Sequence, residues 1–277
     1  MYGNAILCFT NQISMEVAQD VAVTCKNCET VFDGRFCPNC SQKADTHRFT
    51  IKHFLHELFH AITHTDRGIL FLVKEMFLRP GLAMREYVMG KRKKYFSPIT
   101  YFLIITAIQV MVSSKVEIFP AFNESIEQLI KDAAAAAGET VPPDVSMQEN
   151  SKAVAFVSDN SRVVNAIFIP LLALLSWLFF YKSRMNFAES LVLNIGVSAQ
   201  GSLYFFPFGL LPFMLAPSLV ILWIMLYSFL MWTYTMFAYK GFFQQSWGRT
   251  LLKGSVLYLI YTISIQYVVK GLMWLLT

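Results

Sequence analysis

The sequence predicts an all-α membrane protein, with about five transmembrane helices preceded by a small cysteine-rich cytoplasmic domain and amphipathic surface helices. Two observations predict this fold class: a strongly apolar composition, and four cysteines close together near the N-terminus. The 277 residues are 55% hydrophobic and only 15% charged, whereas a soluble domain is about 25% charged. The shortage of charge therefore places most of the chain in a bilayer.

Residues 1–22 show no structural pattern, and we expect them to form an unstructured leader. Their first ten residues lack the basic region and the long apolar core of a signal peptide. Met15 is an alternative to Met1 as the start of translation. Cys8 in this leader is expected to be a free thiol.

Residues 23–45 are expected to form a zinc ribbon, because they contain two Cys-x-x-Cys pairs: Cys25, Cys28, Cys37 and Cys40. Each pair presents two thiolates from one short loop, so two pairs complete a tetrahedral site. Two disulfides are the alternative, which a reducing cytosol disfavours. We expect one structural zinc ion, since four thiolate ligands leave no open position for catalysis.

Residues 49–94 are expected to form amphipathic helices and a basic juxtamembrane segment. Four histidines recur at helical spacing and fall within an arc of about 80°, opposite an apolar face: His53, His56, His60 and His64. The helix is therefore expected to lie on the cytoplasmic membrane surface, with the histidines on its solvent-exposed face. Whether this stripe also binds metal or senses pH stays open.

The same stretch contains a literal H-E-x-x-H motif at residues 56–60. In zinc metalloproteases this spacing places two imidazoles on one helical face, with the glutamate as base. A catalytic zinc also needs a third protein ligand, and no downstream motif supplies one. We assign no catalytic residue, and keep a membrane metalloprotease using His56, Glu57 and His60 as an alternative.

Gly68 to Leu78 is predicted to be a second amphipathic helix that Arg79-Pro80-Gly81 ends. Its apolar set is Ile69, Leu72, Val73 and Met76. A basic cluster follows, formed by Lys91, Arg92, Lys93 and Lys94. These charges anchor the topology and can bind anionic lipid. We expect no nucleic-acid partner, because the same charges lie against the lipid headgroups.

Residues 95–277 are the predicted five-span membrane domain. An uncharged run of about 20 residues crosses about 30 Å of hydrocarbon at about 1.5 Å per residue. Such stretches are 95–114, 163–181 and, broken by prolines between residues 207 and 217 into two helices, 190–239. The fifth span is 254–269, with a lysine at each end.

The basic residues predict the orientation of these spans. Lys91 to Lys94 precede the first span and should stay in the cytoplasm. The loop 115–160 carries eight acidic residues against three lysines and should lie outside, with a short helix at 124–137. We therefore expect a multi-pass protein of the bacterial inner membrane, N-terminus cytoplasmic and C-terminus outside.

No acidic or basic side chain lies well within a predicted span, which disfavours an ion-coupled transporter. Small residues and amides, among them Asn194 and Gln200, mark the third span and are typical of helix packing. A lipid or small-solute conduit along this span is a second alternative.

Several motifs follow the ribbon in order: Asp66-Arg67, Arg79-Pro80-Gly81, Glu86-Tyr87, Gly90-Lys91-Arg92, Tyr95 and Ser97-Pro98. This order resembles a bacterial family of membrane proteins catalogued as domain of unknown function 3667. The resemblance in sequence motifs extends from about Cys25 to Tyr101. After Tyr101 only the amino-acid composition is similar. It implies an N-terminal zinc ribbon before several spans, and no activity. The family ribbon usually continues Cys-Gly-Gln, whereas this chain has Cys40-Ser41-Gln42.

A closed metal site beside a membrane domain without an ionisable core favours a non-enzymatic interaction or regulatory module. We expect the ribbon to bind a cytosolic protein partner. The amphipathic helices would couple that binding to the transmembrane bundle.

Overall fold

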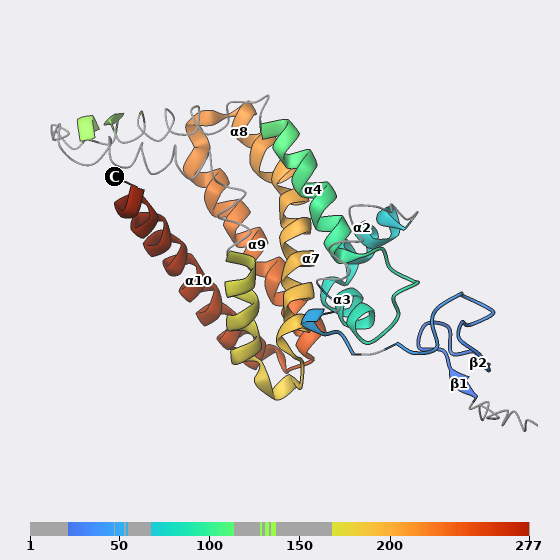
Figure 1. The fold of residues 1–277 in the computed structure, drawn as a ribbon. Helices are drawn as coiled ribbons and strands as arrows, with labels where there is room; N and C mark the ends of the chain where they lie inside the picture. The colour runs from blue at the N-terminus through green and yellow to red at the C-terminus, as the bar shows by residue number, and fades with distance from the viewer. Residues whose placement is uncertain are drawn as a thin grey trace, which may run out of the picture.

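A computed structural model describes residues 22–46, 48–52, 54, 68–113, 128, 131–132, 134–136 and 168–276. Helices dominate these residues, and one short hairpin lies at the N-terminal end (Figure 1). The predicted helical class is therefore confirmed. The histidine stripe, the H-E-x-x-H motif and most of the leader and of loop 115–160 lie outside the described residues.

Two short strands frame the cysteine-rich domain. β1 (Val23–Thr24) pairs antiparallel with β2 (Val31–Phe32). Gly34 follows with a φ of 112°, in the left-handed region that favours glycine. An isolated bridge then joins Phe36 to Lys43. The strand pair encloses Cys25 and Cys28, and the bridge encloses Cys37 and Cys40.

α2 (Ile69–Leu78) and α3 (Pro80–Val88) form a pair of consecutive helices. Arg79-Pro80-Gly81 ends α2, as expected, but a second helix begins at once. Proline is common at the first position of a helix, because an N–H group there has no acceptor within the helix, so its absence costs no hydrogen bond. Leu72 and Met76, two members of the predicted apolar set, are fully buried.

α3 packs closely against the C-terminal end of α9 (Val220–Phe243). A Cβ atom on Gly81 would lie 2.6 Å from the backbone nitrogen of Phe242 and 2.8 Å from Cα of Gly241. Only glycine fits between these two backbones. Arg85 of α3 adds a 2.7 Å hydrogen bond from Nη1 to the carbonyl oxygen of Phe242.

The apolar helices occupy the positions expected for the spans. They are α4 (Pro98–Ser113), the helix Phe168–Phe179, α7 (Phe187–Phe205), α9 and α10 (Trp247–Leu276). A π-turn η2 (Phe206–Leu210), α8 (Leu211–Leu215) and the 3-10 turn η3 (Pro217–Leu219) separate α7 from α9. The predicted break in the long uncharged stretch is thereby confirmed. α10 begins earlier and ends later than the predicted span 254–269.

By length and composition, two described helices suffice to cross a membrane: Phe187–Leu210 and Val220–Phe243. Pro98–Val112 and Phe168–Phe179 are apolar but shorter. In the most apolar stretch of Val220–Phe243 only 22% of residues are buried within the protein. The exposed apolar side chains lie mainly in the N-terminal half of this helix, at residues 221–229.

Buried polar groups of the bundle bind one another. Asn194 donates to Ser176 Oγ at 2.9 Å and accepts from the Tyr239 hydroxyl at 3.0 Å. The Tyr101 hydroxyl donates to Gln200 Oε1 at 2.6 Å and joins α4 to α7. Both amides thus act as helix-packing contacts, as amides do across transmembrane interfaces.

A cavity of about 190 Å³ lies between α7, α9, α10 and the helix Phe168–Phe179. Its lining includes Ser198, Tyr227 and Tyr258, but neither Asn194 nor Gln200. The two amides of the proposed conduit therefore do not open into this cavity.

The N-terminal end of α7 holds a buried charge that the sequence analysis missed. Asn186 and Glu189 form a reciprocal capping box, and Glu189 is fully buried. Arg48 pairs with this carboxylate at 2.6 Å and 2.9 Å and also donates to the carbonyl of Arg184. Asn186 donates to the Phe49 carbonyl at 2.9 Å. The chain that leaves the ribbon is therefore fixed to α7.

Replacing Gly81 by alanine should lower the free energy of unfolding by about 1–3 kcal/mol, because the added methyl group forces α3 and α9 apart. Thermal unfolding of the detergent-solubilised protein measures this effect. Gly248→Ala is the matched control, since a Cβ at Gly248 meets nothing within 4 Å. Equal melting temperatures for the two variants would contradict the close packing.

Candidate metal centre

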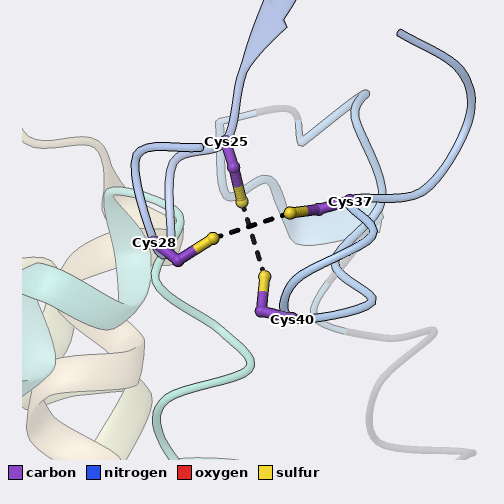
Figure 2. A group of neighbouring side chains, drawn as sticks. All are labelled: Cys25, Cys28, Cys37 and Cys40. Carbon is purple, nitrogen blue, oxygen red and sulfur yellow. Dashed lines mark hydrogen bonds between the residues drawn. The ribbon is translucent and has the colours of Figure 1, made fainter. Parts of the chain in front are cut away.

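The side chains of all four predicted ligands point toward one centre, as Figure 2 shows. Their sulfur atoms lie within 4.8 Å of one another. The shortest separations join the two knuckles: 3.5 Å between the sulfurs of Cys25 and Cys40, and 3.5 Å between those of Cys28 and Cys37. A disulfide bond measures about 2.05 Å, so the four residues are free thiols.

The two knuckles have the same backbone geometry. In each, the first cysteine donates its N–H to the carbonyl five residues later and accepts from the N–H four residues later. The four bonds are Cys25 to Thr30 (2.9 Å), Glu29 to Cys25 (2.9 Å), Cys37 to Gln42 (2.8 Å) and Ser41 to Cys37 (2.8 Å). This repeated turn directs two sulfurs from each loop inward.

The residue after each second cysteine adopts a left-handed conformation. φ is 64° at Glu29 and 58° at Ser41. Glycine adopts this conformation without the strain that a Cβ atom causes. Ser41 therefore occupies a backbone position that favours glycine, and the second knuckle closes in the same way as the first.

The thiols differ in how readily they ionise. Hydrogen bonds from Thr30, whose Oγ1 lies 3.3 Å from the sulfur, lower the pKa of Cys28 to about 6. Burial raises the pKa of Cys40 to about 11. Neighbouring thiolates repel one another, so a cation must be present before all four ionise.

The donor set fits a tetrahedral metal ion. Metal–sulfur bonds of about 2.3 Å place the sulfurs of a tetrahedral site roughly 3.8 Å apart, close to the 3.5 Å measured for the two nearest pairs. Four sulfur ligands select zinc or iron. A site with four protein ligands is closed, so the ion would organise the fold and would not bind a substrate.

All five histidines of the chain lie outside the described residues. The alternative protease ligands His56 and His60, the base Glu57, and the stripe with His53 and His64 therefore stay predictions from the sequence.

The ribbon contacts the segment that joins α3 to α4. Gln42 donates from Nε2 to the carbonyl of Gly90 at 2.8 Å and accepts from the N–H of Lys93 at 3.4 Å. Asn27 accepts from the N–H of Lys94 at 3.1 Å. Asn27 lies inside the first knuckle, and Gln42 directly follows the second. None of these contacts was predicted from the sequence.

Three side chains of the basic cluster interact with other residues of the protein. Lys94 Nζ lies 2.8 Å from Glu86 Oε2, and Lys91 Nζ lies 4.0 Å from the same atom. The Arg92 guanidinium stands 5.2 Å above the Phe49 ring. Burial opposes ionisation of Glu86, but hydrogen bonds from Lys94 and Tyr95 outweigh it and keep the pKa of this carboxyl below its usual value.

Comparison with known protein families gives a match over one segment of the chain. Residues 66–110 match a family described as "Protein of unknown function (DUF3667)". The matched segment comprises α2, α3, the basic cluster and most of α4, and it does not include the cysteines. No curated protein and no solved structure shows significant similarity to the chain. The family likeness thus covers the segment on which the ribbon rests.

Replacing Ser41 by glycine should strengthen metal binding about two- to fivefold, because relief of left-handed strain is worth about 0.5–1 kcal/mol. Competition with a chromophoric chelator measures the affinity of the full chain. The control is Asn39→Gly in the same knuckle, where the φ angle is negative. An equal gain in both variants would show that the strain at Ser41 is not the cause.

The purified protein should contain one zinc ion per chain, and Cys25→Ser with Cys28→Ser should abolish it, because two thiolates do not hold a structural ion. Elemental analysis of the detergent-purified protein measures the content. A His56→Ala, His60→Ala variant tests the alternative motif and should keep its zinc. Two ions in the wild type, one lost in each variant, would contradict a purely structural metal and favour the protease.

Proposed function

We propose that the chain is a non-enzymatic, integral membrane protein of the bacterial inner membrane, in which a structural zinc ribbon serves as an interaction or regulatory module. The observation that carries the proposal is the closed four-cysteine centre, hydrogen-bonded to the segment that leads into the apolar helices. Such a centre offers a folded surface and no catalytic position.

The exposed apolar surface of α9 supports a position in the membrane. Large side chains on this helix are 46–65% exposed: Ile221, Leu222, Met225, Leu226 and Phe229. Soluble monomers rarely expose a contiguous apolar patch of this kind, whereas lipid tails cover it at no cost. We propose that α4, the helix Phe168–Phe179, α7, α9 and α10 are the five spans.

Contacts at one end of the bundle support the proposed orientation. Phe49 is bonded to the start of α7, α3 to the end of α9, and Lys253 of α10 donates to the carbonyl of Phe179 at 2.8 Å. The basic cluster and the basic connections at residues 182–184 and 240–253 therefore lie at the same end. Basic residues mark the cytoplasmic side, so the N-terminus would be inside and the C-terminus outside.

A cytosolic position also favours zinc as the ion, because cytosolic thiols stay reduced and available as ligands. Anionic lipid would contact the remaining exposed charge of the basic cluster. We propose a cytosolic protein as the partner of the ribbon. Val31 and Phe36 are 64% and 56% exposed on its outer surface, and exposed apolar residues of this kind are typical of an interface core.

Changing Val31 and Phe36 to serine should abolish recovery of the cytosolic partner after cross-linking and affinity purification from membranes, because the variant removes the apolar contact. The zinc content must equal that of the wild type, which shows that the ribbon is folded. Asn39→Ser, an exposed polar change on the same ribbon, is the control and should retain the partner. Recovery of the same proteins after deletion of residues 1–45 would overturn the proposal.

A further inference from the structure

We propose that metal binding at the four cysteines holds the juxtamembrane segment Gly90–Lys94 in place, and that loss of the metal releases it. This inference rests on the proposed zinc ribbon. It adds an internal binding site for the ribbon, with Asn27 and Gln42 as its positioning residues, and gives the metal a route of influence on the membrane helices.

Both knuckles contribute to the site. Gln42 is 4% exposed and makes two contacts with the segment, through Nε2 to the Gly90 carbonyl and through Oε1 to the Lys93 N–H. Asn27 adds the contact to the Lys94 N–H. All three bonds are made to backbone atoms, so they depend on the position of the segment and not on its side chains.

The positions of these two side chains depend on the metal site. Asn27 lies between Cys25 and Cys28, and the carbonyl of Gln42 accepts the hydrogen bond that closes the knuckle at Cys37. The buried apolar core of the ribbon consists of Cys25, Phe32 and Cys37. So small a core cannot hold a domain of this size without a metal, and both knuckles should lose their geometry with the ion.

The segment depends on the ribbon in turn. Gly90 ends α3 with a φ of 118°, and a Cβ there would lie 2.9 Å from Cδ of Lys26. Lys26 also donates to the carbonyl of Thr46, at the end of the ribbon, at 2.5 Å. Release of the ribbon would leave the Gly90 carbonyl and the N–H groups of Lys93 and Lys94 without these partners.

The segment connects two helices of the bundle. Lys94 is paired with Glu86 of α3, and α4 begins four residues later, at Pro98. A change in the segment would therefore reach α3 and α4, which pack against α9 and α7. Because coupling between two binding events is reciprocal, docking on the segment should also strengthen metal binding by the ribbon.

Hydrogen exchange of the full chain in nanodiscs tests the coupling. Removal of zinc with a chelator should speed exchange at the N–H groups of Lys93 and Lys94 at least tenfold, because their acceptors move away. Gln42→Ala should give the same increase at Lys93 with zinc still bound, because it removes the acceptor of that N–H group. Unchanged exchange after verified loss of zinc would overturn the inference and leave the structural zinc site intact.

Zinc affinity, measured by chelator competition, tests the reverse direction. Gly90→Ala lies outside the ribbon, yet should weaken zinc binding about tenfold, because a side chain there displaces Lys26 and disturbs docking. Asn27→Ala should weaken it too. The matched control is Asn39→Ala, the equivalent position of the second knuckle, whose side chain bonds Thr30 within the ribbon. This variant should change the affinity less than twofold.

The outcomes separate the two proposals. A wild-type chain that binds no metal would overturn both the zinc ribbon and the coupling. A chain that binds zinc with wild-type affinity in the Gly90→Ala and Asn27→Ala variants would overturn the coupling alone.

Discussion

The convergence of four sulfur atoms within 4.8 Å is the constraint on which the contacts between the ribbon and the helical bundle depend. Thiolates at this distance need a shared cation, and the two knuckles that supply them fix the side chains that follow. Asn27 and Gln42 then reach the backbone of residues 90–94. A site that holds no substrate can in this way influence the position at which α4 begins.

The helices are held together by close backbone contact and by polar groups that satisfy one another. Gly81 lets α3 touch α9 directly, and Tyr239 and Tyr101 bind the two buried amides of α7. Small residues and internal hydrogen bonds of this kind are also what hold helices together in lipid, where the exclusion of water contributes nothing.

Local spacing made the four-cysteine cluster and the break in the uncharged stretch 190–239 predictable, because both patterns are complete within a short stretch of sequence. Arg79-Pro80-Gly81 was correctly interpreted as the end of α2, but the sequence alone does not show that Gly81 belongs to a new helix and packs on Gly241. The capping pair Asn186 and Glu189 is a readable motif that was overlooked. The contacts of Asn27 and Gln42 join residues far apart in the chain, and no local pattern encodes them.

The ion pair between Arg48 and Glu189 has a consequence for how the ribbon moves. Arg48 follows the ribbon almost directly, and its partner is buried at the start of α7. A ribbon freed from residues 90–94 would therefore stay on a very short tether, at an effective concentration on the order of millimolar. Its return after the metal is restored would be an intramolecular reaction, with a rate independent of the protein concentration.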